Sequence, residues 1–69
     1  MTQREFQELL DREPFQPLKV TLASGEAIRI RNPRLVVAMR TQFFVALPND
    51  RFKLVWLRHV SSVEVLQAA

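Results

Sequence analysis

The stretch of residues 18–31, LKVTLASGEAIRIR, decides the fold because it holds two alternating apolar runs and the only glycine of the chain. Alternation of apolar and polar residues with a period of two is typical of half-buried strands. The apolar residues of both runs must share one face of the pair, because a slip of one residue would turn one set toward solvent. The stretch therefore predicts an antiparallel hairpin.

The register of this hairpin follows from the same requirement. Pairing Leu22 with Ile28 and Val20 with Ile30 places all four apolar side chains on one face and leaves a three-residue loop centred on Gly25. Loops of this length need one residue at positive φ, which glycine adopts at little steric cost. We therefore expect Gly25 to have a positive φ.

A helix is expected before the hairpin, over residues 3–12. Thr2 and Glu5 have the spacing of a capping box, and Pro14 excludes its preceding residue from the helical region. After the hairpin, the sequence predicts strands over residues 35–39, 43–47, 51–57 and 61–66.

Three of these expected strands carry a burial prediction. The runs 35–39 and 43–47 are almost continuously apolar, which is typical of strands covered on both faces. In the run 51–57, the residues Phe52, Leu54 and Trp56 share one face and are expected to point into the core.

These elements predict a mainly β fold with one N-terminal helix, in which five or six short antiparallel strands form a small bent barrel. Residues 1–69 are expected to form a single domain, because no linker, repeat or low-complexity segment interrupts them. The residues expected inside the barrel are Val20, Leu22, Ile28, Ile30, Leu54 and Val63.

The amino-acid composition of the chain argues against several classes of function. The chain has no cysteine and a single histidine, so we expect no disulfide, no metal site and no cofactor. Its scattered carboxylates and the lack of a glycine-rich loop predict that it has no catalytic residues and is not an enzyme. No apolar run approaches the roughly 18 residues of a membrane span. We therefore expect a cytoplasmic protein with no membrane partner.

The order of these parts resembles that of the Sm-like (Hfq/LSm-like, SH3-type barrel) family, and in particular its small uncharacterised bacterial members. The lead-in PFQP at residues 14–17, the LASG hairpin at 22–25 and the segment LRHVSS at 57–62 carry the resemblance. The resemblance implies an oligomeric ring that binds RNA. It also implies that Arg58 and His59, which match a Lys-His pair of that family, lie near the RNA. Read without the family, His59 is a polar turn residue.

A basic strand face is the second feature that suggests an anionic partner. Residues 14–69 carry eight basic and three acidic side chains. In the predicted register, Lys19 lies opposite Arg31, and Arg29 lies on the same solvent-facing side. Like charges directly across a ladder are unfavourable, and a bound phosphate would relieve them. Lys19, Arg29 and Arg31 are therefore candidate contacts for single-stranded RNA, although solvated side chains explain the pattern as well.

Two neighbouring aromatic residues predict a partner of another kind. Phe43 and Phe44 are consecutive in an expected strand, so their side chains point to opposite faces. One of them must lie outside the core, which predicts an interface in a homo-oligomer. Two functions stay open: an oligomeric Sm-like module that binds RNA or another polyanion, and a protein-interaction module or assembly subunit with no nucleic-acid role.

Overall fold

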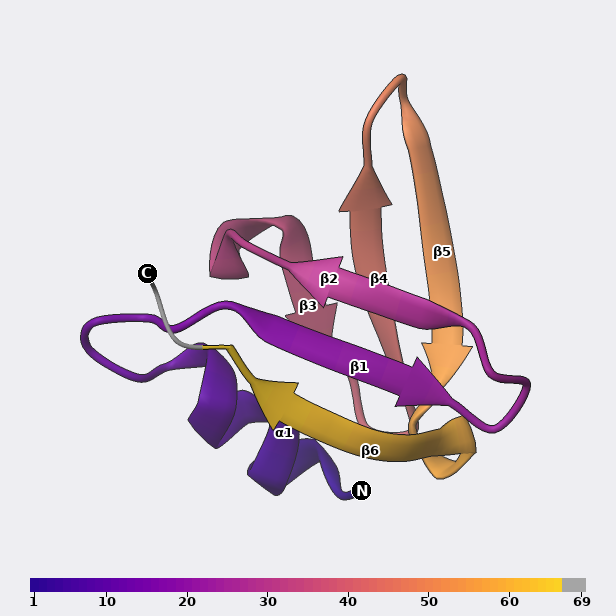
Figure 1. The fold of residues 1–69 in the computed structure, drawn as a ribbon, viewed down its shortest axis with the longest axis horizontal. Helices are drawn as coiled ribbons and strands as arrows, with labels where there is room; N and C mark the ends of the chain where they lie inside the picture. The colour runs from indigo at the N-terminus through magenta and orange to yellow at the C-terminus, as the bar shows by residue number, and fades with distance from the viewer. Residues whose placement is uncertain (67–69) are drawn as a thin grey trace.

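The computed structural model describes residues 1–66 and has one α-helix and six strands (Figure 1). In chain order the elements are α1 (Gln3–Leu10), β1 (Leu18–Leu22), β2 (Ala27–Ile30), the 3₁₀ turn η1 (Pro33–Leu35), β3 (Val36–Ala38), β4 (Gln42–Leu47), β5 (Arg51–Trp56), the 3₁₀ turn η2 (Leu57–His59) and β6 (Val60–Val65). None of the helical segments within these residues is long and apolar enough to cross a membrane.

The strands form two antiparallel sheets of three strands each, in the orders β2-β1-β6 and β3-β4-β5. The chain passes from the first sheet to the second through η1, where Pro33 occupies the first turn and the Asn32 side chain accepts a hydrogen bond from Arg34 N–H, 2.9 Å. It returns through η2, and β6 then pairs with β1. In Figure 1 the β4–β5 hairpin projects beyond the rest of the molecule. The mainly β class with one N-terminal helix is thus confirmed.

The hairpin of β1 and β2 is confirmed, but its register differs from the predicted one by two residues. Val20 lies opposite Ile28 and Leu18 opposite Ile30. The loop is a β-turn in which Gly25 N–H donates to Leu22 C=O, 2.9 Å, and Gly25 has φ +93°. The glycine is therefore the last loop residue, because three-residue loops combine a type I turn with a final residue in the left-handed region. A shift of two residues preserves the side-chain face, so the predicted burial survives.

One core lies between the two sheets, and α1 contributes to it. The rings of Phe6, from α1, and Phe43, from β4, pack with centroids 4.8 Å apart, and both side chains are fully buried. The buried residues are Phe6, Leu10, Leu18, Val20, Leu22, Ile28, Ile30, Val36, Phe43, Val45, Val55 and Leu57, with Val63 partly buried against them. Of the six residues expected inside the barrel only Leu54 is wrong, since its side chain is 53% exposed.

The error at Leu54 extends to the whole of β5, whose predicted faces are inverted. Phe52 and Trp56 are exposed together with Leu54, whereas Val55 is buried. The register explains why: Phe43 pairs with Val55 and Phe44 with Leu54, so the choice of Phe43 for the core brings Val55 inward. The predicted inward orientation of Trp56 is wrong for the same reason.

Within a single chain, β3 and β4 are covered on one face only, so coverage of their second face by a neighbour stays a prediction. Val37 is 55% exposed, between the buried Val36 and the half-buried Ala38. In β4, burial alternates, with Phe43 and Val45 inside and Phe44 half-buried. Each strand of this sheet therefore has one face in the core and one apolar face outside it.

The helix begins as predicted and ends earlier. Glu5 N–H donates to the Thr2 hydroxyl, 3.1 Å, and Thr2 N–H donates to the Glu5 carboxylate, 2.9 Å, which completes the capping box. The hydrogen bond from Thr2 N–H lowers the pKa of Glu5. Asp11 is the C-cap, so the helix stops before the predicted residue 12.

Candidate protein-binding face

The face of the β3-β4-β5 sheet that points away from the core is almost entirely apolar. Side chains alternate along each strand, and the register aligns the outward ones in rows across the sheet. The middle row is Val37, Phe44 and Leu54. Gln42, opposite Trp56, is the polar residue of this face. We define the outer face by the apolar residues Val37, Met39, Phe44, Ala46, Phe52, Leu54 and Trp56.

The outer face exposes several large apolar side chains to solvent. Phe52 is 59% exposed, and Leu54 and Trp56 are exposed beside it. The Phe44 ring stacks on Phe52 with centroids 5.3 Å apart, which covers part of each. Isolated apolar side chains are ordinary on protein surfaces, whereas a contiguous patch indicates an interaction surface.

One corner of the outer face carries two arginines beside an open pocket. The Arg58 guanidinium lies 4.6 Å from the centroid of the Trp56 ring, a cation–π contact. Arg40, in the turn between β3 and β4, lines the same pocket as Trp56 and Arg58, and the start of α1 lines it as well. Within residues 1–66 neither arginine forms an ion pair. We call Arg40 and Arg58 the arginine corner.

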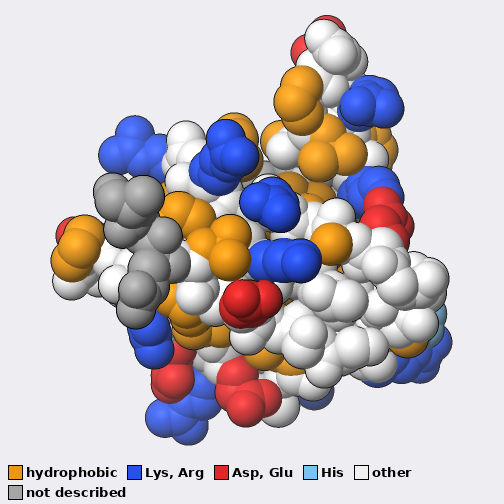
Figure 2. All heavy atoms as spheres, in the orientation of Figure 1, with side chains coloured by type: hydrophobic (Ala, Val, Ile, Leu, Met, Phe, Trp, Pro, Cys, Tyr) orange, Lys and Arg blue, Asp and Glu red, His pale blue; other side chains and the backbone are white. Residues whose placement is uncertain are grey.

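The solvent-facing side of the β2-β1-β6 sheet has a different chemistry. Lys19 lies opposite Arg29 on β2 and opposite Glu64 on β6, so the predicted pairing of Lys19 with Arg31 is wrong by two residues. Figure 2 looks onto this face and shows basic side chains over β1 and β2 with an acidic one beside them. The basic cluster is therefore partly offset by a carboxylate that the predicted hairpin did not include.

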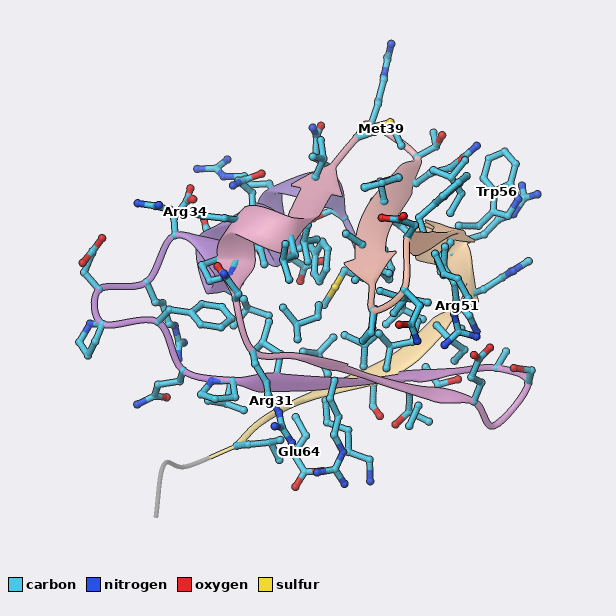
Figure 3. The ribbon with its side chains drawn as sticks, turned by 90° about the horizontal axis from the view of Figure 1, so that it is seen from above. Arg31, Arg34, Met39, Arg51, Trp56 and Glu64 are labelled. Carbon is cyan, nitrogen blue, oxygen red and sulfur yellow. The ribbon has the colours of Figure 1, made fainter. Side chains whose placement is uncertain are left out.

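The five residues predicted to contact RNA do not form one site. Figure 3 shows Arg31 and Glu64 on one side of the molecule, with Met39 and Trp56 on the other. Arg58 stays with Trp56 through the cation–π contact, away from Arg31. His59 belongs to η2, and its carbonyl accepts a hydrogen bond from Ala23 N–H, 2.8 Å, which ties η2 to the hairpin loop.

Phe43 and Phe44 point to opposite faces of β4 as expected, whereas the homo-oligomer interface predicted from them stays a prediction. Phe43 is fully buried, and Phe44 lies on the outer face. The residues that sequence reasoning missed are Phe52, Leu54 and Trp56, which it assigned to the core. The sequence contains a signal for the opposite orientation of β5. Val55 and Leu57 form a second apolar set, one residue out of phase with Phe52, Leu54 and Trp56.

Comparison of the chain with family models, with curated proteins and with solved structures finds no match. The described residues contain no group of three or more histidine, cysteine or carboxylate side chains placed to hold a metal ion. Functional inference therefore rests on the chemistry of the two solvent-facing sheet surfaces.

Proposed function

We propose that this chain is a protein-interaction module, such as a subunit of an assembly, that binds through the outer face. The observation that carries the proposal is the uninterrupted apolar row of Val37, Phe44 and Leu54, which crosses all three strands of the sheet. Complete burial of a large apolar side chain contributes about 1.5–3 kcal/mol, so half-exposed ones retain roughly half of that for a partner. Several such side chains together provide several kcal/mol toward association, before its entropic cost.

The proposal includes a small barrel of the Sm-like or SH3-like type as the scaffold. Two features of the connectivity support it: β6 pairs with β1, and the chain crosses from one sheet to the other between β2 and β3. On such a scaffold the core holds the sheet rigid, so the outer face is preformed and binding requires little ordering of the chain.

Affinity capture from native cell extract tests the proposal when it compares three forms of the protein. The double variant Phe52→Ser/Leu54→Ser should lose the captured protein by about tenfold or more, since each serine removes apolar contact area. The matched control, Arg29→Ser/Arg31→Ser, changes two exposed residues of the other sheet and should capture as much as the wild type. Equal capture by all three forms would argue against the outer face as the binding surface.

Polyanion binding is the second candidate, and the direct opposition of Lys19 and Arg29 favours it. The function would be sequence-independent binding of single-stranded RNA, with Lys19, Arg29 and Arg31 on phosphates. Its test is the salt dependence of affinity. Replacing Arg29 or Arg31 with alanine should reduce the slope of log K against log salt by about 0.7 for each lost phosphate contact. No binding at low salt, or an unchanged slope in Arg29→Ala/Arg31→Ala, would exclude this candidate.

A further inference from the structure

We infer that the partner of the outer face is an acidic polypeptide segment, whose apolar side chains cover the face and whose carboxylates pair with Arg40 and Arg58. This inference rests on the proposed function and adds the chemistry of the partner to it. Three features favour such a partner: the charge around the outer face, the position of Arg58 on Trp56, and the poor electrostatic match between two copies of the chain.

The charges around the outer face are predominantly positive. Arg40 and Arg58 stand at one end of the face, beside Trp56. At the other end the β4–β5 turn carries Asp50 next to Arg51, which balance each other. The net charge of the surroundings therefore comes from the arginine corner.

Basic and acidic groups elsewhere near this sheet already have partners. Lys53, on β5, forms an ion pair with Glu26 of the hairpin loop. The Glu5 carboxylate, in α1, is engaged by Thr2 N–H at 2.9 Å. No carboxylate of residues 1–66 lines the pocket beside the two arginines, so a partner can supply one.

Because Arg58 lies over Trp56, its charge is placed directly beside the apolar outer face. Its guanidinium lies over the Trp56 ring and forms no ion pair within residues 1–66, so its N–H groups can bind a carboxylate in the plane of the guanidinium. A partner that covers Trp56 also removes water from Arg58. A desolvated charge without a counterion is costly, whereas a carboxylate in a low-dielectric setting pairs with it strongly. Neutral and basic partners are therefore disfavoured.

A second copy of the chain is a poorer occupant on the same grounds. Two outer faces match in apolar character, but each copy brings its own Arg40 and Arg58, which form no ion pair within residues 1–66, into the joined interface. The acidic residue available in return, Asp50, has Arg51 beside it. Like charges brought together at an interface cost free energy and suppress association.

The experiment uses a phage-displayed library of random peptides, each about a dozen residues long, selected on the wild-type protein. We expect enrichment of peptides that combine Asp or Glu with large apolar residues. Selected peptides should bind Arg40→Glu/Arg58→Glu at least about tenfold more weakly than the wild type, by fluorescence anisotropy. The matched control, Arg29→Glu/Arg31→Glu, makes the same change of net charge on the other sheet and should bind within about twofold of the wild type.

The outcomes separate this inference from the proposed function. Neutral or basic consensus peptides, no enriched peptide at all, or equal losses in both charge-reversal variants would overturn the acidic partner. If the selected peptides lose affinity for a folded Leu54→Ser variant but not for Arg40→Glu/Arg58→Glu, the outer face binds protein and only the arginine corner is wrong. Full affinity for folded Leu54→Ser would overturn the outer face itself. A dimer of the wild type in sedimentation equilibrium that Leu54→Ser dissociates would replace the acidic segment with a second copy.

Discussion

Gly25 shows how a single residue sets the geometry of the central hairpin. Its φ of +93° is a conformation that an L side chain adopts only with strain. A Cβ built at this position would meet no atom within 4 Å, so the space around it is open. The requirement for glycine is therefore conformational and owes nothing to crowding.

Gly25→Ala is accordingly expected to lower the free energy of unfolding by about 1–2 kcal/mol, the cost of a left-handed conformation for a residue with a Cβ. Urea unfolding measures this change. Ser24→Ala, one residue earlier in the same loop, serves as the control and should stay within about 0.5 kcal/mol of the wild type. Equal unfolding midpoints for Gly25→Ala and the control would contradict the assigned loop geometry.

Glu5 gives the helix start a dependence on pH. The hydrogen bond from Thr2 N–H favours the charged carboxylate and lowers its pKa in the folded state. A lowered folded-state pKa means that the carboxylate stabilises the fold above the unfolded-state pKa, and that this contribution is lost as pH falls through the folded-state pKa. The difference in melting temperature between wild type and Glu5→Gln should therefore be larger at about pH 7 than at about pH 2. A constant difference across this range would show that the charge contributes nothing to the cap.

At the scale of the element, β5 has a clear division between its two faces. Val55 is 7% exposed and pairs with the fully buried Phe43, whereas the neighbouring Leu54 faces out. The same substitution should therefore disrupt the core at Val55 and leave it nearly unchanged at Leu54.

Val55→Ser should destabilise the protein by about 2 kcal/mol or more, since it leaves a cavity and a buried hydroxyl in the core. Leu54→Ser should cost less than about 1 kcal/mol, because its side chain has little core contact to lose. Urea titrations of both variants, followed by circular dichroism, make the comparison. The reverse order of the two costs would restore the face that alternation alone predicts and remove the outer face.

The positions of the helix and strands were more predictable than which face of each strand enters the core. The helix cap at Thr2, the hairpin and the turn at His59 follow from local signals that do not depend on the rest of the fold. In residues 43–47 both faces are apolar, so nothing local decides whether Phe43 or Phe44 enters the core. That choice is made by packing against Phe6, and the pairing of β4 with β5 then transmits it to Leu54 and Val55. The predicted hairpin register was wrong for a related reason. The alternation of apolar residues fixes which face is buried, but it does not distinguish pairings that differ by two residues.

At the scale of the whole molecule, the two sheets present opposite chemistries to solvent. The β2-β1-β6 side is charged and of mixed sign, and the opposite side is the apolar outer face (Figure 3). Sequence reasoning about Phe43 and Phe44 predicted that apolar surface would remain uncovered by a single chain. It could not predict how large the surface is, because Phe52, Leu54 and Trp56 join it only through the register of β5. The basic residues that it grouped as one RNA site are divided between the two sides.

Site-specific photocrosslinking determines whether the outer face binds another protein. A benzoylphenylalanine replaces Phe52 in one form of the protein and Arg29 in another, and both are irradiated in native cell extract. If the outer face is the binding surface, position 52 gives a discrete protein adduct, identified by mass spectrometry, and position 29 gives none. An adduct from position 29 with none from position 52 would contradict it and would assign binding to the charged sheet instead.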